Sequence, residues 1–244
     1  MRKALVLGIG NAQVDLIKAL KEAGWYVIGC SYRCEGRGLD LIDQFELINI
    51  TDFEGIRDLA QKEKVKLIYS IGSDLAMPTV AKVASGLGLP TLVSPEIALL
   101  LQNKLNLRGF LAEHSLSSIS YARIRDENDI DQWATYPAIV KPVDSQGQRG
   151  VFLALNKDDV IGQMGDSLEY SSSRTLIIEE YLDGSEVSVN VFVIDGRIAF
   201  IAISDRLVVK GYAFGIPKAH VFPSNVCSRE DTSAIYCVVQ KCID

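Results

Sequence analysis

The stretch YPAIVKPVDSQGQRGVFLAL, residues 136–155, carries the most specific pattern in this chain. It reads as an apolar strand that carries Lys141, a glycine-rich loop and a second apolar strand. Burying a lysine in an apolar strand is costly unless an anion lies near it. The loop offers several backbone N–H donors that can fold over phosphate groups. Taken singly, the lysine could equally be an edge-strand lysine and the loop an ordinary hairpin. The occurrence of both features side by side favours a triphosphate site.

A second stretch, TLIIEEYLDGSEVSVNVFV, covers residues 175–193. An apolar strand runs into an acidic segment, turns at Asp183-Gly184 and is followed by a strand headed by Glu186. Such a hinge can present backbone amide and carbonyl groups to the edge of a base, while a carboxylate accepts hydrogen bonds from ribose hydroxyls. Without the preceding lysine and loop, these residues would indicate two strands joined by a solvated acidic turn.

The two halves of the chain differ in their pattern of strands and helices. In the first half, strands are expected at 4–7, 26–30, 45–50 and 65–71, alternating with helices at 12–23, 52–64 and up to residue 85. This alternation predicts an α/β domain with a doubly wound parallel sheet. Later strands are closer together, at 119–124, 138–143, 150–155, 175–182, 186–194 and 197–204. The second half is therefore α+β with an antiparallel sheet, and Asp195-Gly196 predicts a tight hairpin turn.

We accordingly expect a Rossmann-like domain at residues 1–94, linker helices at 95–118 with an interruption near Asn103, and an α+β domain at 119–244.

The turn GIGN, residues 8–11, follows the first strand and precedes a helix whose amides could hold an anion. The dinucleotide fingerprint requires a third glycine where Gln13 stands, so a nicotinamide-binding oxidoreductase is the less favoured alternative. A tight structural turn and a small-ligand site both stay open. The candidate substrate-binding residues at this edge of the sheet are Gly8, Gly10, Asn11, Ser73 and Asp74. Asp74 is equally well placed to cap the helix that follows it.

The composition excludes several classes of function. The chain has 244 residues, of which 48% are hydrophobic and 23% charged, as in globular proteins. A net charge of −6 without a Lys/Arg block argues against a nucleic-acid partner, and no apolar run reaches the length of a membrane span. Five cysteines without paired or metal-type spacing fit the reduced thiols of a cytoplasmic protein.

The motifs, in this order, resemble the ATP-grasp superfamily, particularly its carbamoyl-phosphate-synthetase-like and phosphoribosylglycinamide-synthetase-like branch. The resemblance covers essentially the whole chain. Its anchors are NKLNLRGFLAEHSL (103–116), YPAIVKPVDSQGQRGV (136–151) and IIEEYLDGSEVSVNVFVIDG (177–196). It implies an ATP-dependent carboxylate–amine ligase that works through an acyl phosphate. ATP and Mg²⁺ are the implied cofactors, and a small-molecule carboxylate and an amine are the implied substrates.

The resemblance also implies roles for individual residues. Lys104 and Lys141 would reach the ATP phosphates, and Glu186 would hold the ribose. Glu180 would contact the adenine amino group, and His220 would lie near the phosphates or the acyl group as a catalytic candidate, although a plain loop histidine fits as well. The implied ATP-binding residues are Lys104 in the linker helix, Lys141 in its strand, Ser145, Gln146, Gly147, Gln148 and Gly150 in the lid, and Glu179, Glu180, Tyr181, Leu182 and Glu186 in the hinge segment.

The sequence departs from the family in one respect. Family members carry their magnesium ligands on late strands, which should follow the helix that begins near Arg229, but the chain stops at Asp244. We therefore expect no metal ligand within the chain, metal ligands beyond residue 244, and a C-terminally truncated ATP-binding fragment that is inactive alone. A non-catalytic nucleotide-binding or regulatory module is the alternative. Whether the chain forms a homodimer stays open.

Overall fold

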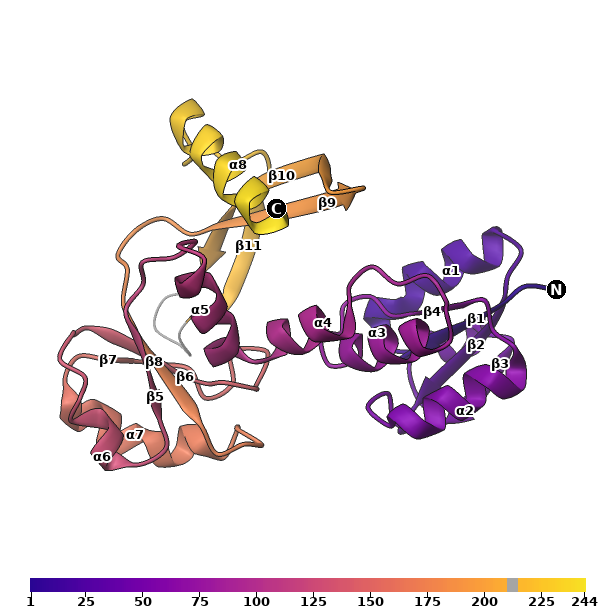
Figure 1. The fold of residues 1–244 in the computed structure, drawn as a ribbon, viewed down its shortest axis with the longest axis horizontal. Helices are drawn as coiled ribbons and strands as arrows, with labels where there is room; N and C mark the ends of the chain where they lie inside the picture. The colour runs from indigo at the N-terminus through magenta and orange to yellow at the C-terminus, as the bar shows by residue number, and fades with distance from the viewer. Residues whose placement is uncertain (210–214) are drawn as a thin grey trace. The chain divides into compact units, whose positions relative to one another are not determined.

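The computed structural model describes residues 1–209 and 215–244 (Figure 1). By their contacts these residues form two compact units, Met1–Gln102 and Asn103–Asp244. The division into domains at residues 94 and 118 stays a proposal.

A parallel sheet forms the centre of the first unit. Its strand order is β3-β2-β1-β4, with β1 at Lys3–Leu7, β2 at Tyr26–Ser31, β3 at Gln44–Leu47 and β4 at Leu67–Tyr69. Leu5 of β1 lies between Ile28 and Ile68 of the neighbouring strands. Ala4 to Leu7 are fully buried, because a central strand covered on both faces has no solvent side.

Helices cover both faces of this sheet. Helix α1 (Val14–Glu22), which follows the 3₁₀ turn η1 (Asn11–Gln13), packs on the face of Ala4 and Val6. Helices α2 (Phe53–Glu63) and α3 (Met77–Gly86) pack on the opposite face, and α4 (Pro95–Gln102) lies against α3. The doubly wound parallel sheet predicted from the sequence is confirmed.

The second unit begins with helix α5 (Lys104–Glu113) and contains a four-stranded antiparallel sheet. Its order is β5-β8-β6-β7, with β5 at Tyr121–Ile124, β6 at Ala138–Pro142, β7 at Phe152–Ala154 and β8 at Leu176–Glu180. Figure 1 shows helices α6 (Glu127–Ile130) and α7 (Lys157–Leu168) on one side of this sheet and α5 on the other. Val140, Leu176 and Ile178 face α7 in the core, so Lys141 and Glu179, one residue along each strand, face the other way.

A second antiparallel sheet has the order β11-β10-β9, with β9 at Val187–Ile194, β10 at Arg197–Val208 and β11 at Pro217–Val221. The predicted tight turn joins β9 to β10, and both of its residues, Asp195 and Gly196, have positive φ as a two-residue hairpin requires. Helix α8 (Arg229–Ile243) packs against β10. The predicted change from an α/β to an α+β half is confirmed.

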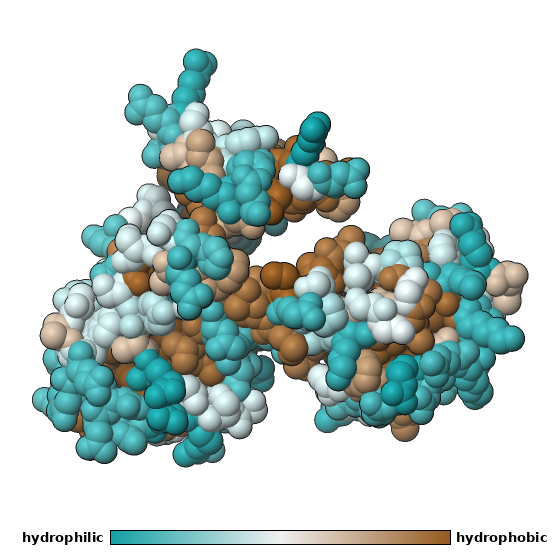
Figure 2. All heavy atoms as spheres, viewed as in Figure 1, coloured by the Kyte–Doolittle hydropathy of each residue, from teal (hydrophilic) through white to brown (hydrophobic). Residues whose placement is uncertain are grey.

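Apolar side chains stay at the surface of this second sheet. Phe192, Ile194 and Phe200 of the β9–β10 hairpin are more than half exposed, and Figure 2 shows hydrophobic surface there. None of the residues of α8 is buried.

The sequence reading missed α6, α7 and β11. In α7, two glycines interrupt the helical pattern, although Val160, Met164 and Leu168 recur at a spacing of four. In β11, Pro217 opens the strand, and proline is tolerated there because the strand lies at a sheet edge. Several predicted strands are also longer than the observed ones, as for 65–71, where only Leu67–Tyr69 is a strand.

We predict that Leu176→Ala destabilises the second unit by about 2–5 kcal/mol, because it leaves a cavity in the core between the sheet and α7. Leu176 is fully buried, whereas Leu155, its matched control, is 64% exposed. Leu155→Ala should change stability by less than about 0.5 kcal/mol. Urea denaturation followed by circular dichroism measures both. Equal effects of the two substitutions would contradict this packing.

Candidate functional site

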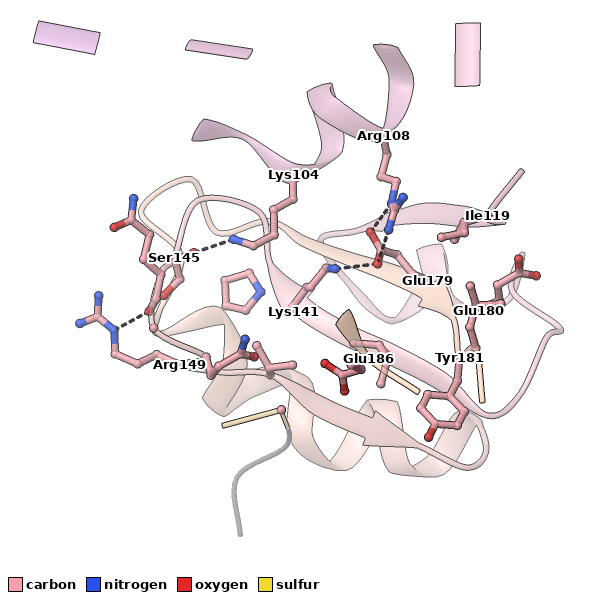
Figure 3. A pocket seen from close by; sticks show the side chains of 18 of the residues that line it. Lys104, Arg108, Ile119, Lys141, Ser145, Arg149, Glu179, Glu180, Tyr181 and Glu186 are labelled. Carbon is pink, nitrogen blue, oxygen red and sulfur yellow. Dashed lines mark hydrogen bonds and ion pairs between the residues drawn. The ribbon is translucent and has the colours of Figure 1, made fainter. Parts of the chain in front are cut away.

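A cavity of about 470 Å³ lies in the second unit, which is within the range of about 300–1,000 Å³ usual for ligand pockets. It is lined by α5, β6, the glycine loop after β6, the end of β8 and β10. Eleven of the twelve residues predicted to bind ATP line it; Gly150 does not. In Figure 3, Lys104, Ser145 and Arg149 lie at one side of the pocket, Glu180 and Tyr181 at the other, and Lys141 and Glu186 between them.

A buried carboxylate joins two cations in the wall of this cavity. Arg108 donates from Nε to Oε1 of Glu179 at 2.8 Å and from Nη2 to Oε2 at 3.3 Å. Lys141 Nζ donates to Oε2 of the same carboxylate at 2.6 Å. Glu179 is 5% exposed. Lys141 on its apolar strand therefore has the anionic partner that its burial requires, and this partner belongs to the protein.

The charges around Glu179 change its acidity. Burial by itself would raise the pKa of this carboxyl, but the hydrogen bonds from Arg108 and the charge of Lys141 hold its pKa below the ordinary value of 4.5. Glu179 therefore stays ionised at neutral pH. The sequence reading did not name Arg108. Its position four residues after Lys104, on the same face of one helix, is the signal that could have identified it.

Lys104 connects α5 to the glycine loop. Asn103, where the sequence predicted an interruption, caps α5 by accepting from the backbone N–H of Leu105 at 3.0 Å. The backbone N–H of Lys104 donates to the carbonyl of Val143 at 2.9 Å, and its Nζ donates to the carbonyl of Ser145 at 2.5 Å. The first turn of α5 is thus tied to the start of the loop, with the ammonium group at the cavity.

The loop is fixed at both of its ends. Asp144 accepts from Ser171 Oγ at 2.7 Å and from the backbone N–H of Ser173 at 2.9 Å. The carbonyl of Gly150 accepts from Ser167 Oγ at 2.6 Å. Gly150 has φ +71°, and a Cβ there would lie 2.9 Å from Pro142 Cγ. Gly150 therefore lies at the fixed end of the glycine loop and does not line the cavity. It was predicted to be part of the lid.

The hinge after β8 borders the other side of the cavity. The backbone N–H of Glu180 donates to the carbonyl of Ser120, and that of Tyr181 donates to the carbonyl of Pro137, both at 3.1 Å. These bonds fix the path of the hinge at the point where β8 ends. Apolar side chains that the sequence reading did not name also line the cavity, namely Ile119, Ile139 and Val151. The flat face of an aromatic ring would fit against such a wall.

Glu186 enters the cavity from just before β9 and forms an ion pair with Arg206 of β10. The sequence reading did not name Arg206 either, because its partner lies 20 residues away along the chain, just before the neighbouring strand.

His220 lies on β11, directly opposite Arg206 in the strand pairing, and is exposed. It does not line the cavity. Its catalytic role stays a prediction that this placement does not support.

The N-terminal turn forms a smaller cavity of about 250 Å³ in the first unit, lined by Gly8, Gly10 and Ser73 among others. Asn11 lies outside this lining, and Asp74 lines a different cavity. Gln13 Oε1 accepts from the backbone N–H of Gly10 at 3.0 Å, so the amide that a dinucleotide phosphate would need is already bonded. The side chain of Asp74 does not cap α3.

Over residues 1–209 and 215–244, no group of three or more His, Cys, Asp or Glu side chains is arranged to hold a metal ion. All five cysteines are free. No helix of the described part is long and apolar enough to cross a membrane.

Comparison with known proteins finds relatives but no matching family profile. A formate-dependent phosphoribosylglycinamide formyltransferase of Prochlorococcus marinus is 26% identical over 193 residues, covering 75% of this chain and 48% of that protein. An ATP-grasp enzyme of Aspergillus fumigatus, fsqD, is 34% identical over 105 residues, covering 39% and 18%. The crystal structure of N5-carboxyaminoimidazole synthetase from Staphylococcus aureus complexed with ADP matches with a TM-score of 0.80 at 18% identity, covering 99% and 62%. The chain spans about half the length of the first of these relatives.

We predict that Glu179→Gln lowers stability by about 1–3 kcal/mol at neutral pH, because Arg108 and Lys141 lose their shared anion. The pKa of Glu179 is lower in the folded state, so its contribution is complete above about pH 4.5 and is lost as pH falls through the folded pKa. The difference between wild type and variant should therefore narrow in acid.

Urea denaturation between pH 7 and pH 3 measures this difference, with Glu113→Gln, an exposed position at the end of α5, as the control. A difference that stays constant over this range would mean that the carboxylate charge does not stabilise the site.

Proposed function

We propose that this chain, which has the ATP-grasp fold, binds ATP in the cavity of its second unit and is part of an ATP-dependent ligase that joins a carboxylate to an amine. The resemblance to the ATP-grasp superfamily predicted from the sequence is confirmed by the fold similarity and by the curated relatives.

The observation that carries the proposal is the distribution of charge in this cavity. Among the residues that the structure describes, five basic side chains line it, against three acidic ones. The basic residues are Lys104, Arg108, Lys141, Arg149 and Arg206, and the acidic residues are Glu179, Glu180 and Glu186. An excess of cations beside a glycine loop favours a polyphosphate, while the apolar wall at the hinge favours a base.

These features suggest one orientation of the nucleotide. The base lies between Ile139 and the hinge, and the ribose hydroxyls donate to Glu186. The phosphates extend toward Lys141 and Lys104, under the loop at residues 145–149. A similar structure was solved with ADP, which supports a nucleotide at this kind of site.

The chemistry that we propose follows from this orientation. The terminal phosphoryl group of ATP is transferred to the substrate carboxylate, which gives ADP and an acyl phosphate. The amine then attacks the acyl carbon, and phosphate leaves. The lysines hold the phosphates in place and neutralise the charge that builds up on them during transfer. Mg²⁺, when bound with the nucleotide, would supply further neutralisation of charge, although the described residues form no cluster of three or more His, Cys, Asp or Glu side chains that could hold it.

The small cavity at the carboxyl edge of the parallel sheet is our candidate for a substrate site. Ligands of open α/β sheets bind at this edge, and Gly8, Gly10 and Ser73 line the cavity there together with Arg33.

Formation of ADP that depends on both a carboxylate and an amine would distinguish a ligase from a nucleotide-binding module without activity.

We predict that Lys141→Met weakens ATP binding about tenfold or more, because one charge-assisted hydrogen bond to a phosphate contributes about 1.5–3 kcal/mol. Adenosine, which lacks phosphates, should bind the variant and the wild type about equally. Isothermal titration calorimetry with both ligands measures the difference.

Lys157→Met is the matched control, because Lys157 lies in the same unit but pairs with Asp131 at the surface. If the wild type bound no ATP, or if Lys141→Met weakened ATP and adenosine equally, the phosphate-binding role would be rejected.

A further inference from the structure

Arg206 holds Glu186 through both its main chain and its side chain. The backbone N–H of Arg206 donates to the carbonyl of Glu186 at 2.8 Å, and Nη1 donates to the Glu186 carboxylate. Nη2 of Arg206 donates a second hydrogen bond, to the carbonyl of Gly215, at 2.5 Å. The Arg206 side chain is 19% exposed and that of Glu186 is 46% exposed. The arginine is thus the more buried and better fixed member of the pair.

Glu186 needs such a partner if it is to bind a nucleotide. A half-exposed glutamate has several rotamers, and ordering it on binding costs free energy. An unpaired carboxylate would also repel the phosphates of a nucleotide in the same cavity. Arg206 removes both obstacles before the ligand arrives, because it selects one orientation and neutralises the charge.

We propose that Arg206 is a positioning residue for ribose recognition, which orders Glu186 so that its carboxylate accepts from the ribose hydroxyls. An ionised carboxylate has about four acceptor positions, so it can keep its bond to Arg206 while it accepts from a ligand. This inference rests on the proposed function and adds to it a residue that the sequence motifs do not contain.

The second contact of Arg206 explains why an arginine suits this position. The guanidinium serves two acceptors in two directions, which a lysine ammonium on a flexible stem does not do with the same geometry. Gly215 in turn lies beside the glycine loop, since a Cβ at Gly215 would come within 3.2 Å of Gln148 Oε1. Arg206 therefore also fixes the backbone against which the tip of this loop lies.

The test compares ATP with 2′,3′-dideoxy-ATP, which keeps the base and the triphosphate but lacks both ribose hydroxyls. We expect wild type to bind ATP about tenfold or more tightly than the dideoxy nucleotide, as for hydrogen bonds to a charged group. In the Arg206→Met variant, the affinities for ATP and for the dideoxy nucleotide should differ by less than about threefold. Glu186→Gln should lower the ratio of the two affinities similarly, and the double variant should show no further loss, because the two residues act as one unit.

Arg197→Met is the matched control, since Arg197 lies on the same strand, is exposed and does not line the cavity. It should keep the wild-type ratio. Arg206→Lys should give an intermediate ratio, and it provides a second variant if Arg206→Met does not fold. Thermal unfolding of each variant checks that the fold is intact.

An Arg206→Met variant that keeps the wild-type ratio, or that loses affinity for both nucleotides equally, would overturn the inference. If the wild type bound the two nucleotides equally, the inference about Arg206 would also be overturned. The proposal that the cavity binds ATP would not be affected. A wild type that binds neither nucleotide would instead reject ATP binding in this cavity, on which the proposed function depends.

Discussion

The ion cluster of Glu179 with Arg108 and Lys141 is the interaction on which the rest of the site depends. A carboxylate buried on a sheet is costly unless cations satisfy it, and here one cation comes from α5 and the other from β6. The cluster therefore fixes the position of a helix over a sheet by charge as well as by packing. It also leaves a surplus of basic side chains facing the cavity, which a polyphosphate would neutralise.

The glycine loop shows how the fold combines fixed and adaptable parts. Hydrogen bonds from Ser171 to Asp144 and from Ser167 to Gly150 hold its two ends against the connection around α7. The residues between these anchors carry the backbone groups that face the cavity. A loop fixed in this way can adjust to a ligand at its tip without disturbing the strands on either side. Arg206 has the corresponding role at the opposite wall, where it orders Glu186.

Much of this organisation could be predicted from local patterns. The buried run of β1, the Asp195-Gly196 turn and the alternation in β6 each follow from the conformational preferences of a few neighbouring residues. The missed elements are those in which local signals conflict, such as the glycines in α7. The functional residues that were missed, Arg108 and Arg206, share one property: their partners are 71 and 20 residues away along the chain.

The sequence alone determined the order of the motifs, the resemblance to the ATP-grasp superfamily and the residue types available for binding phosphate. The tertiary structure decided which of these residues meet. In the folded chain Lys141 lies beside Glu179. Gly150 and His220 do not line the cavity, whereas Arg108 and Arg206 do. The reason is physical: a strand or turn forms from interactions among neighbours, whereas an ion pair forms only where the fold brings distant side chains together and removes water from around them.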